Sequence, residues 1–457
     1  MQTTIDTPKV AARKAPGPRG LPLLGNALAF GRDPLGFLTH TARTYGDVAR
    51  VTFGPATIYQ ISHPELIEQV LVTHNRSFPK EDIEKARGSL DYLLFGTGLL
   101  TSNGEFWLRQ RRLAQPAFHR QRIAGYSEAT VESTQRLLAG WRDGQALDVH
   151  EEMMRLTLEI VGQTLFGSQV STEAGEVGEA LGVVMDVSAE TLGKPFQLPY
   201  HIPTPTNRRF VAAVRRLEAV ITRMLNERRA SDADTGDLLS MLLHARDEDG
   251  SRMDDRQLRD ELITLFLAGH ETTALALSWT WYLLAQHPEV ETRLHQELDR
   301  VLGGRAPTMA DLPALRYTEL VLRESMRLYP PAWTLSGRIA ARDTELGGFH
   351  IPAGSLMSIS QWVTHRDPRF FPEAERFQPE RWEGDLEKRL PRFAYFPFGG
   401  GPRLCIGQAF AMMEATLILA VVAQRFHLAL VPGQRVVPQP SITLRPRYGV
   451  KVQLHQR

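Results

Sequence analysis

Apolar residues recur at intervals of three and four positions between about residue 63 and residue 329, with Pro or Gly at the breaks. This spacing gives each helix an apolar face and therefore predicts a mainly helical protein. The segment Asp254–Gln286 is apolar on nearly all sides, which is typical of a long buried helix, and Pro288 lies beyond its end. Gln408–Phe426 is a second helical segment of high apolar density.

Strand patterns occupy a smaller part of the chain. Val48–Phe53 and Thr57–Ile61 alternate around Gly54-Pro55, which predicts a hairpin. Thr334–Val363 is rich in β-branched and turn residues and predicts short strands, and Phe426–Val431 is expected to pair with Val450–Leu454. The predicted fold class is therefore mainly α with a small β portion (α+β).

The chain has no internal repeat and no linker-like segment, so residues 21–457 are expected to form one domain. Residues 1–20 are polar and end in Pro16-Gly17-Pro18, which predicts a disordered lead-in. Residues 193–207 carry four prolines and are expected to form a loop between helices.

Composition excludes several classes of function. With 53 Lys and Arg against 52 Asp and Glu, the net charge of +1 gives no sign of binding to nucleic acid or to an anionic membrane. One cysteine excludes an internal disulfide framework and favours a reducing compartment. No apolar run approaches the roughly 18 to 20 residues of a membrane span. A soluble cytoplasmic protein without a membrane anchor is expected.

The most informative stretch runs from Phe398 to Gly407 and reads Phe-Gly-Gly-Gly-Pro-Arg-Leu-Cys-Ile-Gly. Three successive glycines and a proline exclude a regular helix or strand and predict a tight loop whose N–H groups can turn inward. Cys405 lies where this loop meets the following helix. Because a helix N-terminus and nearby N–H donors lower the pKa of a thiol, the position favours a thiolate.

Three interpretations of this loop compete on the residues alone. A phosphate-binding loop would require a Gly-Lys-Ser/Thr ending, which is absent. A catalytic thiol would require a His base and an orienting group, which one sequence does not identify. A structural cysteine buried after a turn is the third interpretation.

The loop resembles the haem-binding loop of the cytochrome P450 family, Phe-x-x-Gly-x-Arg-x-Cys-x-Gly. Phe398, Gly401, Arg403, Cys405 and Gly407 match all five fixed positions. The resemblance implies that Cys405 is the axial thiolate ligand of a haem b iron, where electron donation from sulfur favours O–O cleavage. Phe398, Arg403 and Gly407 would then belong to the haem pocket.

The middle of the long apolar helix, Ala268–Thr273, reads Ala-Gly-His-Glu-Thr-Thr. Gly inside a helix costs about 1 kcal/mol relative to Ala, and such departures from local preference concentrate at functional sites. A helix kink with a solvated polar patch would give the same pattern. The segment resembles the oxygen-activation motif of the family, which implies that Gly269 opens a groove beside the iron, Thr272 faces dioxygen, and Glu271 belongs to the proton relay.

Glu324 and Arg327 match the Glu-x-x-Arg pattern of the family. Four other pairs fit it equally, namely Glu84 with Arg87, Glu152 with Arg155, Glu297 with Arg300, and Glu373 with Arg376. Glu324 shares a helix face with apolar residues and is therefore predicted to point inward, where a carboxylate needs a partner. The resemblance supplies Arg381 as the third member of a buried scaffold that holds the cysteine loop.

Trp107 and Arg111 lie four residues apart and share a helix face. They resemble the family's clamp on a haem propionate, with Arg338 as a second clamp and Arg403 as a third. The same basic helix is expected to include four more arginines, either as an ordinary solvated face or as a docking surface for a ferredoxin (with its reductase) or a flavodoxin: Arg109, Arg112, Arg120 and Arg122.

The resemblance extends over nearly the whole chain and implies a bacterial-type, stand-alone haem domain, expected to be a monomer. The implied activity is oxygen-dependent hydroxylation or epoxidation of an apolar small molecule, with dioxygen as co-substrate and electrons from separate redox partners. The pocket is expected to include Leu100, Ala268, Ala332 and Thr334, and to admit a fatty acid, terpenoid or steroid. Alternatives are a haem-binding sensor or carrier without turnover, and a haem-free cysteine hydrolase.

Overall fold

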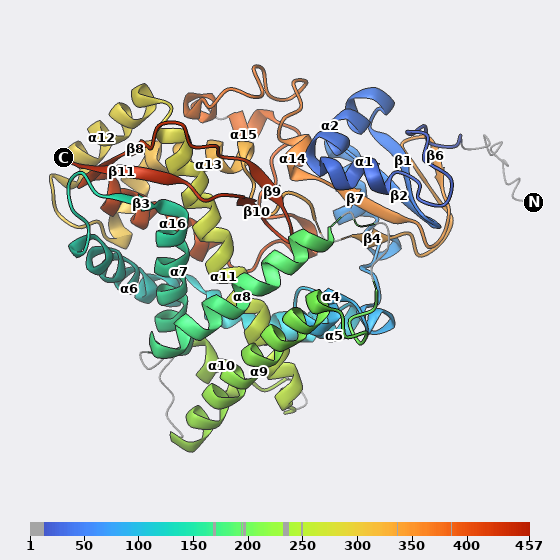
Figure 1. Ribbon diagram of the computed structural model, residues 1–457, viewed down its shortest axis with the longest axis horizontal. Coiled ribbons are helices and arrows are strands. Elements are labelled where there is room, and N and C mark those ends of the chain that lie inside the picture. Colours follow the sequence, from blue (N-terminus) through green and yellow to red (C-terminus); the bar gives the residue numbers. More distant parts are fainter. Residues whose placement is uncertain are drawn as a thin grey trace, which may run out of the picture.

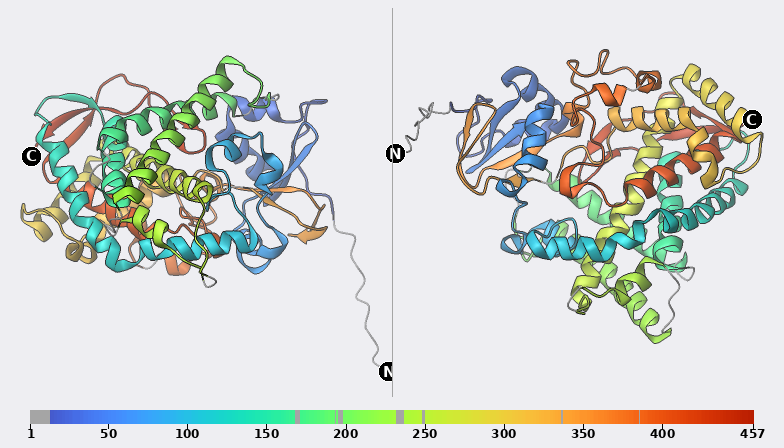
Figure 2. Two further views of the ribbon diagram at one scale, coloured as in Figure 1. Left: turned by 90° about the horizontal axis from the view of Figure 1, so that it is seen from below. Right: turned by 180° about the vertical axis from the view of Figure 1, so that it is seen from behind.

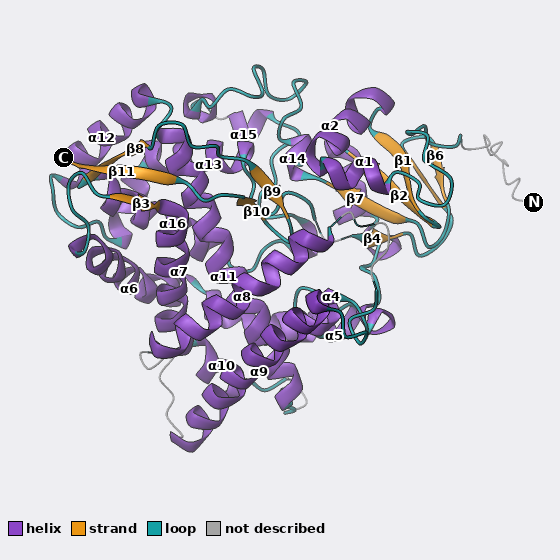
Figure 3. Ribbon diagram, in the orientation of Figure 1, coloured by secondary structure: helices purple, strands orange, loops and turns teal. Residues whose placement is uncertain are grey.

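The computed structural model describes residues 13–167, 171–192, 194, 198–231, 237–247, 250–335, 337–384 and 386–457. Helices make up most of the molecule and the strands gather into small sheets (Figure 3). The predicted fold class, mainly α with a small β portion, is confirmed.

The helices follow one another in this order (Figure 1): α1 Ala27–Arg32, α2 Pro34–Tyr45, α3 Pro64–Glu68, α4 Leu90–Phe95, α5 Gly104–Ala114, α6 Arg120–Ala139, α7 Val149–Phe166, α8 Ser171–Thr191, α9 Pro205–Ser231, α10 Leu238–His244, α11 Asp255–Leu284, α12 Pro288–Leu302, α13 Arg316–Leu328, α14 Gln361–Thr364, α15 Leu386–Arg389 and α16 Gln408–Ala423. The strands are β1 Val48–Phe53, β2 Ala56–Ile61, β3 Ala146–Asp148, β4 Arg338–Ile339, β5 Thr344–Leu346, β6 Phe349–Ile351, β7 Leu356–Ile359, β8 Phe426–Leu430, β9 Pro438–Pro440, β10 Leu444–Pro446 and β11 Lys451–Gln456.

The main sheet has the strand order β1-β2-β7-β4 and includes the predicted hairpin. β1 pairs antiparallel to β2 with Val48 opposite Ile61, and β7 lies parallel to β2. A second sheet, β3-β11-β8, contains the predicted pairing of the C-terminal strands, with Val452 opposite Leu430. The two sheets lie at opposite ends of the molecule (Figure 2).

The segment before residue 21 differs in part from the prediction of a disordered lead-in. Residues 1–12 lie outside the described residues, but the chain from Arg13 onward packs on the sheet. Arg13 forms a bridge with Phe349, and the N–H of Arg50 donates to the carbonyl of Pro16 at 2.7 Å. Residues 13–20 therefore belong to the fold, because their backbone extends the hydrogen bonding of β1.

The proline-rich segment 193–207 falls between α8 and α9, although its last residues already form the first turn of α9. Residues 193 and 195–197 lie outside the described residues.

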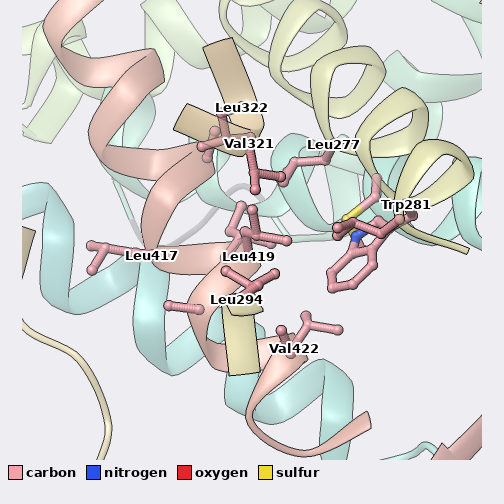
Figure 4. Close-up of a cluster of buried hydrophobic side chains, with 14 of the residues drawn as sticks. Leu277, Trp281, Leu294, Val321, Leu322, Leu417, Leu419 and Val422 are labelled. Atoms are coloured by element: carbon pink, nitrogen blue, oxygen red, sulfur yellow. The ribbon is translucent and has the colours of Figure 1, made fainter. Parts of the chain in front are cut away.

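The long helix α11 runs through the core, as the sequence predicts. It begins after Asp254, whose side chain forms a capping box with Gln257. Its C-terminal half packs against α12, α13 and α16 in a cluster of fully buried side chains, shown in Figure 4: Leu277, Trp281, Leu294, Val321, Leu322, Leu417, Leu419 and Val422. Burial of each aliphatic side chain contributes about 1.5–3 kcal/mol, so this cluster fixes α11 firmly beneath the site described next.

Candidate active site

The burial of α11 is interrupted at its centre on one face. Residues 262–267 and 273–281 are buried, whereas Ala268 is exposed and Gly269 and Thr272 are partly exposed. At 3.6 residues per turn these three positions lie on one side of the helix. An accessible strip within an otherwise buried helix shows that α11 borders an open space there. We call Ala268, Gly269 and Thr272 the accessible strip.

The side chain of Thr272 is partly exposed, and a hydrogen bond to the helix backbone fixes its orientation. Its Oγ1 donates to the carbonyl of Ala268 at 2.7 Å. The hydroxyl proton is therefore engaged by the helix, and the oxygen lone pairs remain available to accept a hydrogen bond from the accessible side. Thr273 is buried, and its hydroxyl lies 3.4 Å from the carbonyl of Gly269.

Glu271 points to a different part of the protein from Thr272. It is fully buried, and its Oε1 accepts from Arg445 Nε at 2.7 Å and from Thr443 Oγ1 at 2.6 Å. Burial alone would raise the pKa of this carboxyl, but the charge and hydrogen bond of Arg445 outweigh it and hold the pKa below its usual value. The structure thus places Glu271 beside Arg445, 174 residues away in sequence.

His270 is buried between these neighbours with its Nδ1 unpartnered, and burial lowers its pKa to about 4, so the ring is neutral. Among the described residues no group of three His, Cys, Asp or Glu side chains could hold a metal ion. His270 is 1% exposed, so its ring does not belong to the accessible strip.

Cys405 has an accessible side chain at the end of the predicted glycine loop. Its N–H donates to the carbonyl of Phe398 at 3.0 Å, which closes the loop before α16 begins. Only glycine fits at Gly401, because its φ is +66° and a Cβ there would lie 2.2 Å from the carbonyl oxygen of Leu71. At Gly407 a Cβ would lie 4.0 Å from the sulfur, which is an ordinary van der Waals contact, so space alone does not require glycine there.

The thiol itself departs from the prediction of a lowered pKa. Surrounding protein raises the pKa of Cys405 above its ordinary value, and the N–H of Gly407 and the charge of Arg111 offset this only in part. The predicted direction was wrong because desolvation of the sulfur exceeds the stabilisation from the helix N-terminus. A thiolate at this position is favoured when a metal cation supplies further positive charge.

Four cationic side chains lie close to one another, and one of them, Arg111, acts on Cys405; the sequence singles out three of the four. Arg111, Arg338 and Arg403 are joined by Lys80, which is buried and donates from Nζ to the carbonyl of Leu100. Trp107 is buried in the same group, and the Arg403 guanidinium carbon lies 3.9 Å from its ring centroid. We call Lys80, Arg111, Arg338 and Arg403 the cation cluster.

The electrostatics of the cation cluster indicate an anionic ligand. Burial, together with the charges of Arg338 and Arg403, holds the pKa of Lys80 well below its usual value, although Asp91 opposes this in part. Burial lowers the pKa of Arg338 to about 10, and burial with repulsion from Arg338 and Arg111 lowers that of Arg403 to about 9. Buried like charges are stabilised by an anion, so the cluster fits the two propionates of a haem whose iron Cys405 would bind.

No signal in the sequence distinguishes Lys80 from the other lysines. Its burial follows from tertiary contacts, since its backbone N–H and carbonyl both bond to the side chain of Asn103.

Glu324 and Arg327 are both fully buried, with Arg327 Nη2 2.8 Å from Glu324 Oε1. Arg381 Nε joins them at 2.7 Å from the same oxygen, and Trp382 Nε1 donates to the other oxygen at 2.9 Å. Arg327 also donates to the carbonyls of His365 and Ala374, at 2.9 and 2.6 Å. We call Glu324, Arg327 and Arg381 the scaffold triad.

The scaffold triad is linked to the cysteine loop through His365. The Nε2 of this buried ring accepts from the N–H of Phe396, which lies just before the glycine loop, at 2.9 Å. Of the other pairs with the same spacing, Glu84 with Arg87 and Glu373 with Arg376 lie on the surface at 3.7 and 3.4 Å. Glu324 alone among these glutamates is joined to both of the arginines proposed for the scaffold.

The expected pocket residues are accessible to different degrees. Leu100 is exposed and lies in the loop between α4 and α5. Ala332 and Thr334 are partly exposed, and the Thr334 hydroxyl donates a hydrogen bond to the carbonyl of Ile359 at 3.0 Å.

The basic helix predicted around Trp107 is in fact two helices. α5 ends at Ala114 and α6 begins at Arg120, because Gln115–Phe118, which contains Pro116, forms a 3-10 turn between them. On α5, Arg109 and Arg112 pair with Asp247 at 2.9 and 3.5 Å, which reduces the positive charge of this face.

Searches for related proteins agree with this geometry. The family described as Cytochrome P450 matches residues 15–454. A cyclooctatin synthase from Streptomyces melanosporofaciens is 42% identical over 94% of this chain and 94% of its own length. A cyclooctat-9-en-7-ol 5-monooxygenase from the same organism is 42% identical over 91% of this chain and 90% of its own length. A pentalenene oxygenase from Streptomyces avermitilis is 36% identical over 98% of each chain.

Within the described part of the chain, none of the helices has the length and apolar character needed to cross a membrane. The match over nearly the whole length, the accessible strip and the environment of Cys405 lead to one conclusion. The chain belongs to the cytochrome P450 family and is a monooxygenase that uses haem b as its cofactor, dioxygen as co-substrate, redox partners as electron donors and an apolar substrate.

Proposed function

We propose that this monooxygenase hydroxylates or epoxidises a terpenoid. The observation that carries the proposal is the accessible strip, where small side chains leave room beside α11 for a bulky apolar molecule. Leu100 offers an exposed apolar surface rather than an aromatic ring. Two relatives are named for cyclooctat-9-en-7-ol and pentalenene, which supports a terpenoid over a fatty acid or a steroid.

Separate groups of residues are proposed to bind the haem and to hold the cysteine loop. Bound haem supplies the redox-active iron at which dioxygen is activated. Cys405 would hold the iron and donate electron density to it, while Arg111, Arg338 and Arg403, with Trp107, would hold the propionates. The scaffold triad keeps the cysteine loop in place through His365.

Thr272 and Glu271 handle protons at different atoms. Thr272 Oγ1 accepts a hydrogen bond on the accessible side because its own proton is engaged by Ala268. Glu271 Oε2 has no hydrogen-bond partner among the described residues, so this oxygen of the ionised carboxylate remains able to accept a hydrogen bond from a proton carrier. Arg445, which is partly exposed, connects this carboxylate to the surface.

The electron donor is proposed to be a ferredoxin, with its reductase, or a flavodoxin. Arg120 and Arg122 are exposed at the start of α6, and Leu404, the neighbour of Cys405, is 39% exposed. An acidic donor that binds there would reach the face of the protein nearest the sulfur. A cytoplasmic location, as expected from the sequence, is part of this proposal.

Two spectroscopic measurements and one product analysis test the proposal. The reduced, carbon monoxide-bound holoprotein should give the thiolate-haem band, and Cys405→Ala should abolish it. Terpenoid hydrocarbons and alcohols should shift the haem spectrum at lower concentrations than straight-chain fatty acids, and ferredoxin with NAD(P)H should convert them to oxygenated products. Tighter binding of fatty acids would overturn the substrate class, and binding without turnover would overturn the enzymatic role.

A further inference from the structure

The loop 96–102 joins α4 to α5, which both lie near α11 (Figure 1), and its backbone is hydrogen-bonded to side chains of that helix. Glu261 and Thr264 precede Ala268 by seven and four residues, so helix periodicity places all three on one stripe. Seven residues correspond to about 10 Å along the helix axis. The loop that carries Leu100 is therefore attached to α11 about two turns before the accessible strip.

Buried acids of α11 hold the backbone of this loop. Asp260 Oδ2 accepts from the N–H of Thr97 at 2.8 Å, and Glu261 Oε2 accepts from the N–H of Leu99 at 3.0 Å. Both side chains are buried, with 1% of Asp260 and none of Glu261 exposed. Arg259 donates to the carbonyls of residues 93 and 94 in α4, just before the loop, each at 3.2 Å. The attachment is thus made by three consecutive residues of the helix.

Two glycines allow the loop to lie directly on the helix. A Cβ at Gly96 would lie 2.0 Å from Asp260 Oδ2, and a Cβ at Gly98 would lie 2.4 Å from Thr264 Oγ1. Gly96 also has a φ of +51°, which favours glycine. Neither position tolerates a side chain while the loop keeps its place.

The opposite side of the loop is attached to the cation cluster. Arg403 donates to the carbonyl of Ser102 at 2.7 Å, and Lys80 donates to the carbonyl of Leu100. Leu99 is buried between the two attachments, whereas Leu100 is 41% exposed. The position of Leu100 is therefore fixed by α11 on one side of the loop and by the cation cluster on the other.

Two adjacent buried acids are a costly way to fix a loop. Glu261 Oε1 has no partner among the described residues, and burial raises the pKa of this carboxyl to about 8. Apolar side chains at both positions would avoid the desolvation of two carboxyl groups, and replacement of buried ionic groups by apolar residues is often neutral or stabilising. What apolar residues would not supply is an acceptor for the N–H groups of Thr97 and Leu99.

We propose that Asp260 and Glu261 are positioning residues for substrate selectivity, because they hold loop 96–102 on α11 and so fix the position of Leu100 relative to the accessible strip. The proposal rests on the proposed function for the identity of the pocket. It assigns the two acids no contact with substrate or haem. Their effect is transmitted through the backbone N–H groups of Thr97 and Leu99.

Amide hydrogen exchange tests the attachment directly. In the holoenzyme, Glu261→Ala should speed exchange at Leu99 by about 10-fold or more, since a buried hydrogen bond to a carboxyl group is lost. Glu261→Gln should preserve most of the protection, because the amide oxygen still accepts from Leu99. The matched control is Glu297→Ala, which should leave exchange at Leu99 unchanged. Glu297 is 6% exposed and accepts from the N–H groups of Tyr317 and Thr318, at 2.7 and 2.9 Å.

Ligand selectivity tests the consequence. The dissociation constants of a monoterpenoid and a diterpenoid alcohol, measured by haem spectral shift, should change their ratio by on the order of ten-fold in Glu261→Ala. Glu261→Gln should restore the wild-type ratio, and Glu297→Ala should leave it unchanged. Gly98→Ala leaves both acids in place and should change the ratio in the same direction as Glu261→Ala, which keeps the test available if the latter fails to fold.

The outcomes separate the two proposals. Unchanged exchange at Leu99 in Glu261→Ala would overturn the attachment, and faster exchange with an unchanged ligand ratio would overturn its role in selectivity. A wild-type protein that binds neither alcohol would contradict the proposed function, yet exchange at Leu99 would still report on the loop.

Discussion

The scaffold triad and the cation cluster are both charged and lie near the cysteine loop, but only the charges of the triad are matched within the chain. The triad is buried, whereas in the cluster Lys80 and Arg338 are buried and Arg111 and Arg403 are partly exposed. Every charge of Glu324 and Arg327 meets an opposite charge or a backbone group at 2.6 to 3.1 Å. The cation cluster instead brings four like charges together. Burial lowers the pKa of each, and repulsion between the cations adds to this for Lys80 and Arg403. A buried network that satisfies itself serves the fold, whereas one with excess charge of one sign is built for a ligand of the other sign.

The difference predicts opposite behaviour in the haem-free protein. Damage to the triad should destabilise the chain whether or not haem is bound, because the remaining charge stays buried without its partner. Removal of a cation from the cluster should weaken haem binding and spare the haem-free protein. Comparison of the two forms of each variant therefore separates structural from ligand-binding residues.

Glu324→Gln should have the largest effect. The substitution leaves Arg327 and Arg381 buried beside a neutral group, and loss of one partner of a buried ion pair costs about 3–5 kcal/mol. Urea unfolding of the haem-free protein should show this loss, and haem incorporation should fall with it. Glu84→Gln alters an exposed pair with the same sequence spacing and should cost less than about 1 kcal/mol. Equal losses in the two variants would contradict the assignment of the triad.

Arg403→Met should reduce haem retention by about 10- to 100-fold, which corresponds to the roughly 1.5–3 kcal/mol of a charge-assisted hydrogen bond. The rate of haem transfer to an excess of a haem-scavenging globin measures this. Arg392→Met, at an exposed position paired with Glu68, is the control and should leave the rate unchanged. A variant that unfolds as readily as Glu324→Gln while keeping its haem would reverse the two roles.

Much of the architecture could be predicted because it is encoded locally. Asp254 before an apolar repeat gives the start of α11, and the glycines before Cys405 give the tight loop. The inward orientation of Glu324 likewise followed from the apolar residues on its helix face.

What the sequence could not predict depends on contacts between distant segments. Lys80 is buried and Lys85 is 84% exposed, although both lie in the same polar stretch. The partner of Glu271 is 174 residues away, and the sign of the pKa shift of Cys405 depends on how densely the folded protein surrounds it. Periodicity and motif spacing contain none of this information.

Lys80→Met should have opposite effects on the haem-free protein and on the holoprotein. Removal of this charge relieves the repulsion from Arg338 and Arg403, so the haem-free protein should become more stable by about 1 kcal/mol in urea unfolding. The holoprotein should nevertheless lose haem about 10-fold faster, since one cation facing the propionates is gone. Lys85→Met should change neither quantity. Destabilisation of both forms would mean that the bond from Lys80 to Leu100 matters more than its charge.

Glu414 extends the comparison to an acid that belongs to neither network, and its effect appears only as a change of stability with pH. It is fully buried on α16 and neither carboxyl oxygen has a partner among the described residues. Burial raises its pKa to about 8 from an ordinary value of 4.5, against an opposing influence of the Thr273 hydroxyl. The folded protein therefore keeps a proton that the unfolded chain loses. This contribution to stability is complete below pH 4.5 and is lost as the pH rises through 8.

Glu414→Gln cannot ionise and should escape that loss. Between pH 4.5 and 8 the unfolding free energy of the variant should rise relative to that of the wild type, by at most about 1.4 kcal/mol per pH unit. Urea unfolding of the haem-free proteins at intervals across this range measures the difference. A constant difference would show that Glu414 is ionised throughout, which would require a buried partner and would place it with the self-satisfied scaffold triad instead.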